Sequence, residues 1–157
     1  MKDFSKLVAS VVGCELVGIL SIPFTISAIT TWYVFLNKPF FSPPNWVFGP
    51  VWTILYFMMG ISAFLIWQRG LGNKKVKRAL TYFLIQLFFN FLWSFLFFGL
   101  HSPIIGLVDI IALLISIILT IGAFYKISKA AAYLLIPYFL WVSFATLLNI
   151  AIVLLNR

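Results

Sequence analysis

The chain has 157 residues, of which 64% are hydrophobic and only 9% are charged. Soluble domains are closer to half apolar and a quarter charged, so this composition excludes an ordinary soluble protein and indicates a membrane protein. The formal net charge is +8, but the basic residues lie beside apolar runs and not in one patch. This distribution argues against a nucleic-acid partner.

Five apolar runs of about 20 residues are each long enough to span the ~30 Å hydrocarbon core of a bilayer. We therefore expect an all-α fold, in which residues 1–157 form a single domain, an integral membrane bundle of five transmembrane helices. Pro23 is expected to kink or end the first helix. The expected helices cover residues 7–27, 46–68, 79–99, 103–125 and 130–155.

The connection between the first two helices, residues 32–44, is unusual for a loop because it is aromatic. Pro39, Pro43 and Pro44 exclude a continuous helix there, since proline fixes φ and removes a backbone donor. A flexible loop would instead be polar and rich in Gly and Ser. We interpret residues 32–44 as a stiff lid over the bundle, and we refer to them as the lid segment.

Lys and Arg are distributed unequally between the two ends of the predicted bundle. Nine of them lie near the N-terminus or in the connections 69–78 and 126–129, whereas the opposite end has only Lys38 and Arg157. Positive residues are enriched on the cytoplasmic side of membrane proteins. The sequence therefore predicts a multi-pass protein of the cell membrane with its N-terminus in the cytoplasm, and with its C-terminus and lid segment outside.

Two carboxylic acids fall inside predicted spans, where an ionisable group is costly unless it is paired, protonated or hydrated. Glu15 lies about 12 Å into the first helix, and both a structural and a functional role stay open for it. Asp109 is nearer the other face, so the two are not expected to form a carboxylate dyad. For Asp109 we expect a hydrogen bond to a neighbouring helix.

Three helices have a face that combines large aromatic, small and hydrogen-bonding residues at helical spacing. Such faces can reflect ordinary packing, or they can line a pocket for a flat, mostly apolar ligand. The three faces consist of Gly49, Trp52, Tyr56, Gly60 and Ala63; of Gln86, Asn90 and Trp93; and of Tyr138, Trp141, Ala145 and Asn149.

Several kinds of chemistry are not expected. His101 is the only histidine and has no second ligand near it in sequence, so we predict neither a metal site nor a bound metal cofactor. Cys14 is the only cysteine, which excludes an intramolecular disulfide. No cofactor is expected.

Four segments together resemble one known family. They are WYVFLNKPFFSPPNWVFGPVWTILYFMMG (32–60), QLFFNFLWSFLFFG (86–99), GLVDIIAL (106–113) and PYFLWVSFATLLN (137–149). This pattern resembles the translocator protein family, whose members are also called tryptophan-rich sensory proteins or peripheral-type benzodiazepine receptors. The resemblance covers roughly residues 28–150, and its Trp/Pro motif is specific.

The resemblance implies a five-helix membrane protein, commonly a homodimer, that binds porphyrins such as protoporphyrin IX and haem-type tetrapyrroles. It also implies binding of isoquinoline carboxamide and benzodiazepine-type ligands in a pocket inside the bundle. The short C-terminus is typical of prokaryotic members. Ile150 follows Asn149 where animal members have the Tyr of a cholesterol motif, so sterol binding is not expected. The positions that match the family's ligand site are Tyr33, Pro43, Trp52, Asn90, Trp141 and Ala145.

Three functions remain open at this point. The first is a receptor or transporter for tetrapyrroles that performs no covalent chemistry. The second is an enzyme, because some family members have been proposed to degrade porphyrin in light, with Trp52 and Trp141 as oxidisable catalytic indoles beside the excited ring. The third is a transporter coupled to Glu15 and Asp109, which is the weakest because the spans show no inverted repeat.

Overall fold

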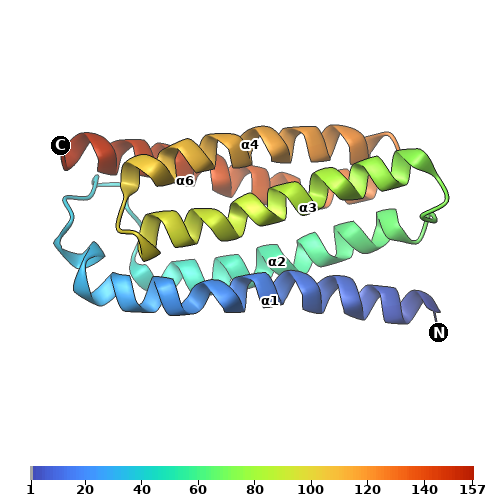
Figure 1. Ribbon diagram of the computed structural model, residues 1–157, viewed down its shortest axis with the longest axis horizontal. Coiled ribbons are helices and arrows are strands. Elements are labelled where there is room, and N and C mark those ends of the chain that lie inside the picture. The colour runs from blue at the N-terminus through green and yellow to red at the C-terminus, as the bar shows by residue number, and fades with distance from the viewer. Residues whose placement is uncertain (1) are drawn as a thin grey trace.

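The computed structural model describes residues 2–157, and over this range the chain is helical, with no β-strand. Five segments are long and apolar enough to span a membrane, which confirms the predicted all-α five-helix membrane bundle. Figure 1 shows the spans running alternately in opposite directions, with the two termini at opposite ends. The spans are α1 (Lys2–Thr31), α2 (Asn45–Trp67), α3 (Lys74–Ser94) with η2 (Phe95–Gly99), α4 (Pro103–Tyr125), and α5 (Lys129–Leu134) with α6 (Ile136–Leu155).

Two helices are longer than the sequence predicted. Pro23 does not end α1, which continues to Thr31; an internal proline removes one backbone donor, and transmembrane helices tolerate this when local adjustments satisfy the freed groups. Helix α3 begins at Lys74, because the side-chain oxygen of Asn73 accepts a hydrogen bond from the Lys75 backbone N–H at 2.9 Å. This interaction is a standard N-cap.

Two spans change their helical geometry part-way. At the end of α3, the N–H of Leu100 donates to the carbonyl of Phe95 at 2.9 Å, so the last turn, η2, is a π-helix. Between α5 and α6 the helix is interrupted at Leu135, where the missing N–H of Pro137 removes one hydrogen bond from the ladder. The expected single fifth helix is therefore two helices in one span.

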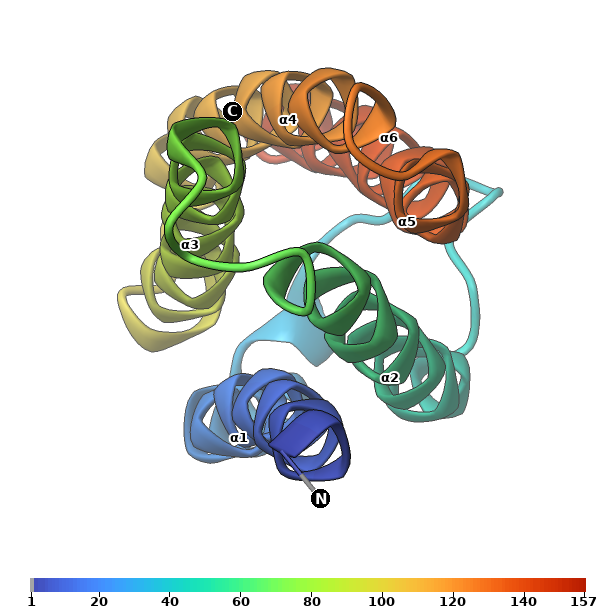
Figure 2. The same cartoon turned by 90° about the vertical axis from the view of Figure 1, so that its right-hand side faces the viewer.

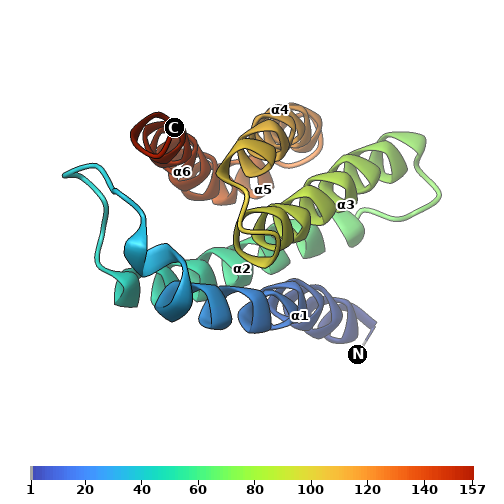
Figure 3. The same ribbon diagram turned by 60° about the vertical axis from the view of Figure 1, so that its left-hand side comes forward.

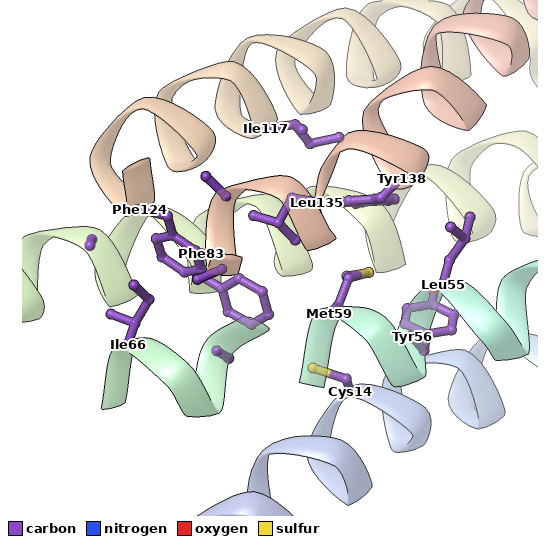
Figure 4. Packing of buried hydrophobic residues seen from close by; sticks show 14 of the residues in the cluster. Cys14, Leu55, Tyr56, Met59, Ile66, Phe83, Ile117, Phe124, Leu135 and Tyr138 are labelled. Atoms are coloured by element: carbon purple, nitrogen blue, oxygen red, sulfur yellow. The ribbon is translucent and has the colours of Figure 1, made fainter. Parts of the chain in front are cut away.

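Seen along the bundle, α1 lies at the edge and packs mainly on α2, whereas α4 packs between α3 and α6 (Figure 2). Figure 4 shows part of the buried apolar cluster between these helices, including Met59 on α2 and the stacked rings of Phe83 and Phe124. A close contact brings α1 and α2 together, since a Cβ added to Gly60 would lie 2.5 Å from Cα of Val11.

The lid segment contains a short helix, η1 (Tyr33–Phe35), followed by a non-helical stretch with a turn at residues 40–41 that leads to the start of α2 (Figure 3). Its middle is attached to the end of α6. The N–H of Asn37 donates to Oδ1 of Asn156 and Nδ2 of Asn156 donates to the carbonyl of Asn37, both at 2.9 Å. Trp32 stacks on His101 with the ring planes 9° apart. We call this end of the bundle the lid end.

Candidate functional site

A cavity of about 400 Å³ lies at the lid end, between α1, α2, η2 and α6. Its volume is within the range of sites that bind drug-sized molecules. Tyr33 of the lid segment is part of the lining and is only 3% exposed. The cavity is thus a space inside the bundle that the first turn of the lid segment covers.

The walls of the cavity are largely aromatic. Trp52 lies 5.5 Å from Tyr56 between ring centroids, one helical turn away on α2, and Trp141 on α6 lies 6.0 Å from Phe48. From α3 and η2, Trp93 and Phe97 also line the cavity, and their rings stack at 5.1 Å. Flat aromatic faces of this kind favour a ligand that is itself flat and apolar.

The π-helix contributes to these walls. In a regular α-helix each backbone hydrogen bond joins residues four apart in sequence. In η2 the bonds join residues five apart, so the turn that follows Trp93 contains about one more residue than a regular turn. Phe97 and Phe98 both line the cavity, with their rings 4.8 Å apart in an edge-to-face arrangement. Single π-helical turns are found frequently at functional sites, because they redirect side chains.

Most polar groups of the lining are already hydrogen-bonded within the protein. The indole N–H of Trp93 donates to Oδ1 of Asn149 at 3.1 Å, and Nδ2 of Asn149 donates to the carbonyl of Pro103 at 2.9 Å. The hydroxyls of Thr25 and Thr53 donate to carbonyls of their own helices. These groups are therefore not free to contact a ligand.

Among the described residues, Glu15 is the one acidic side chain that lines the cavity. It forms neither a hydrogen bond nor an ion pair with another described residue. Asp109 is buried on α4 and does not line the cavity, and its Oδ2 has no hydrogen-bond partner. The expectation that the Asp109 carboxylate bonds to a neighbouring helix is therefore not met at this atom. Two more buried atoms, Nε2 of Gln86 and Nε1 of Trp141, also have no partner.

Beneath the cavity floor, a hydrogen-bonded group links three helices. Tyr56 on α2 donates to Oδ1 of Asn90 on α3, and Nδ2 of Asn90 donates to the hydroxyl of Tyr138 on α6 at 2.8 Å. Tyr138 in turn donates to Oε1 of Gln86 at 2.7 Å. Only Tyr56 of these four lines the cavity, so the group supports the floor from below.

The structure brings four of the six expected site residues together around the cavity: Tyr33, Trp52, Trp141 and Ala145. Asn90 is not among the lining residues, because it is only 3% exposed and its amide is hydrogen-bonded to the two tyrosines. Pro43 is also absent from the lining, since the cavity is covered by Tyr33 and not by the later part of the lid segment.

Sequence reasoning did not anticipate the large contribution of α1. Gly18, Ile22 and Ile29 are among the α1 residues that line the cavity. Gly18 carried a signal, since it is a small residue in an apolar helix, and a Cβ there would lie 2.7 Å from the Tyr56 ring. The isoleucines carried no signal, because aliphatic residues face either lipid or protein in a transmembrane helix.

Tyr33 provides an uncharged polar group at the top of the cavity. Burial raises the pKa of the Tyr33 phenol above its ordinary value, and a side-chain hydrogen bond with Ser42 partly opposes this shift. Nζ of Lys38 donates to the carbonyl of Tyr33 at 2.9 Å and lies 4.7 Å from the centre of its ring. Over residues 2–157, no three His, Cys, Asp or Glu side chains are grouped so that they could hold a metal ion.

These features define a five-helix membrane protein with an aromatic cavity at one end of its bundle. The model of the TspO/MBR family matches residues 10–155, which is nearly the whole chain. The chain therefore belongs to the TspO/MBR family.

Relatives from archaea, bacteria and animals agree with this assignment. The chain is 52% identical over 151 residues to the tryptophan-rich protein TspO of Archaeoglobus fulgidus, covering 96% of this chain and 97% of the relative. It is 37% identical over 126 residues to the tryptophan-rich sensory protein of Cereibacter sphaeroides, covering 80% and 77%. It is 40% identical over 119 residues to the translocator protein of Homo sapiens, covering 75% and 70%.

Proposed function

We propose that this protein binds a flat, mostly apolar tetrapyrrole, such as protoporphyrin IX, in the cavity at the lid end, and that it acts as a receptor or transporter. The observation that carries the proposal is the cavity itself, whose walls include Trp52, Trp93 and Trp141 on three different helices. A planar ring system gains apolar burial and aromatic contact against such walls. Isoquinoline carboxamide and benzodiazepine-type ligands share the same flat shape, so we expect them to compete for this site.

A receptor or transporter fits the polar groups better than an enzyme that needs general acid–base catalysis. Most hydrogen-bonding groups of the lining are occupied by protein partners, as for Trp93 with Asn149. General acid–base chemistry requires a titratable group within reach of the reacting atoms, and in the described lining these groups are Glu15 and the phenols of Tyr33 and Tyr56, of which Tyr56 already donates to Asn90. A photochemical reaction makes no such demand, and it remains the second candidate because two indoles that were expected as reactants, Trp52 and Trp141, both line the cavity.

The test is a titration of the protein in lipid nanodiscs with protoporphyrin IX, using the fluorescence of the porphyrin. Ala145 lines the cavity, so Ala145→Leu fills part of the space and should weaken binding at least about tenfold, the effect of a modest overpacking cost. Ala130 is exposed at the opposite end of the bundle and does not line the cavity, so Ala130→Leu serves as the matched control. Equal affinities of both variants and the wild type would refute binding in this cavity.

We further propose that the protein lies in the cell membrane as a homodimer, with its N-terminus in the cytoplasm and the lid end outside. The orientation rests on the charge asymmetry, and the dimer rests on the family resemblance. In the fold, the lid segment and the C-terminus lie at one end, and the N-terminus and the 68–73 connection lie at the other (Figure 1). Crosslinking in native membranes, followed by sizing, measures whether the dimer forms.

A further inference from the structure

Some residues that line the cavity are also exposed on the outer surface of the bundle. On α1 these are Ile19, Ile22 and Ile26, whose side chains are 54%, 45% and 63% exposed. They recur at three- and four-residue spacing and therefore lie on one face of the helix. A side chain that borders both the cavity and the exterior marks the edge of an opening.

The facing helix has an equivalent set. Asn45, Gly49 and Thr53 on α2 line the cavity, are exposed, and are spaced four residues apart. A Cβ added to Gly49 would meet no atom within 4 Å, so the space in front of this residue is open. The cavity thus has a side opening, the slot, between the lid-end halves of α1 and α2.

The slot exists because α1 and α2 touch tightly only further from the lid. There, Gly60 allows α2 to approach the backbone of Val11, and Gly18 allows α1 to approach the ring of Tyr56. Beyond these contacts the two helices are joined by the lid segment, a non-helical stretch after η1 with one turn, in which the N–H of Ser42 donates to the carbonyl of Pro39 at 3.1 Å (Figure 3). Small residues thus close one half of the helix pair and leave the other half open.

At the lid end, by contrast, the cavity is covered by the lid segment. The lid segment is tied to α6 by the two hydrogen bonds between Asn37 and Asn156. Two further hydrogen bonds lie within the lid segment: Nζ of Lys38 donates to the carbonyls of Tyr33 and Leu36 at 2.9 and 3.2 Å. Tyr33 is almost fully buried beneath these contacts.

We propose that the ligand enters and leaves through the slot, directly from the bilayer, so that the protein selects molecules dissolved in the membrane over molecules dissolved in water. This inference rests on the proposed function. The rim of the slot suits contact with acyl chains, because three isoleucines form the α1 side. On the α2 side, the hydroxyl of Thr53 donates to the carbonyl of Gly49 at 2.9 Å, so it presents no unpartnered donor to lipid.

The experiment measures the association rate of protoporphyrin IX with the protein in liposomes, by stopped-flow porphyrin fluorescence. Gly49→Phe adds a ring at the slot from a position where the new Cβ meets no atom within 4 Å, and it should slow association and dissociation each by at least tenfold. Gly122→Phe is the matched control, since Gly122 is also exposed, has no atom within 4 Å of an added Cβ, and lies away from the cavity. Asn156→Ala, which removes the two hydrogen bonds between the lid segment and the Asn156 side chain, should leave both rates within twofold of the wild type.

A second measurement distinguishes the source of the ligand. Porphyrin added from water should reach the protein only after it has partitioned into the bilayer, at a rate that protein-free liposomes measure, whereas binding that precedes partitioning would overturn entry through the slot. A wild-type rate for Gly49→Phe, or faster association for Asn156→Ala, would overturn entry through the slot while leaving the proposed binding function intact. If Gly49→Phe does not fold, Ile22→Trp on the α1 rim replaces it. Absence of any porphyrin binding by the wild type would instead overturn the proposed function, and this inference with it.

Discussion

The hydroxyl of Tyr56 on α2 donates a hydrogen bond to the side-chain oxygen of Asn90 on α3. The same amide donates to Tyr138 on α6, so one buried side chain links three helices. Tyr56 also lines the cavity, whereas Asn90 does not. The structure therefore gives Asn90 a supporting role beneath the site, where the family resemblance implied a contact with the ligand.

Replacing Asn90 tests this distinction. Asn90→Leu leaves the two tyrosine hydroxyls without their amide partner and should lower the free energy of unfolding by about 1–2 kcal/mol, the scale of interhelical hydrogen bonds in membranes. Porphyrin affinity should fall less than tenfold. Thermal unfolding in nanodiscs and a fluorescence titration measure the two effects. An unchanged unfolding temperature with a loss of binding larger than tenfold would mean that Asn90 contacts the ligand directly.

Gly60 should be essential to the contact between α1 and α2. In Gly60→Leu the new side chain would have to displace the backbone of Val11, since a Cβ alone would lie 2.5 Å from its Cα. We expect a loss of at least about 1–3 kcal/mol, as for overpacking in a core. The matched control is Gly13→Leu on α1, where no atom lies within 4 Å of an added Cβ. If the two variants unfold at the same temperature, α1 is not held at this contact.

Substitution of the cavity tryptophans separates a binding protein from a photochemical enzyme. Trp52→Phe and Trp141→Phe keep an aromatic wall but remove an easily oxidised indole. We expect each change to cost roughly 1 kcal/mol or less of porphyrin affinity. Light-driven formation of a discrete porphyrin product, where it occurs, should be lost in both variants. Product formation at the wild-type rate would eliminate the indoles as reactants, and a collapse of binding in both would make their role structural.

The orientation in the membrane can be tested with two single cysteines in a Cys14→Ser background. Phe40 is fully exposed in the lid segment, and Gly72 is exposed at the other end with no atom within 4 Å of an added Cβ. In intact cells, an impermeant maleimide should label Phe40→Cys and should not label Gly72→Cys until the membrane is permeabilised. The reverse pattern would place the N-terminus outside.

The sequence by itself determined the class of protein and most of its helices. Apolar runs long enough to cross a bilayer are a local property, so α2 and α4 begin and end within one residue of the predicted bounds. The Trp/Pro motif of residues 32–60 likewise identified the family. The same periodicity placed Trp52, Trp141 and Ala145 on faces that meet at the cavity.

The tertiary structure alone decided which of those faces reach the cavity and where it opens. Helical spacing shows that Gln86, Asn90 and Trp93 share a face, but only packing reveals that Trp93 borders the cavity while Asn90 is enclosed by two tyrosines. The isoleucines of α1 are equally suited to lipid and to protein. Their place at the slot depends on how far α1 and α2 diverge beyond Gly18 and Gly60, and helix crossing is a property of the pair and not of either sequence segment.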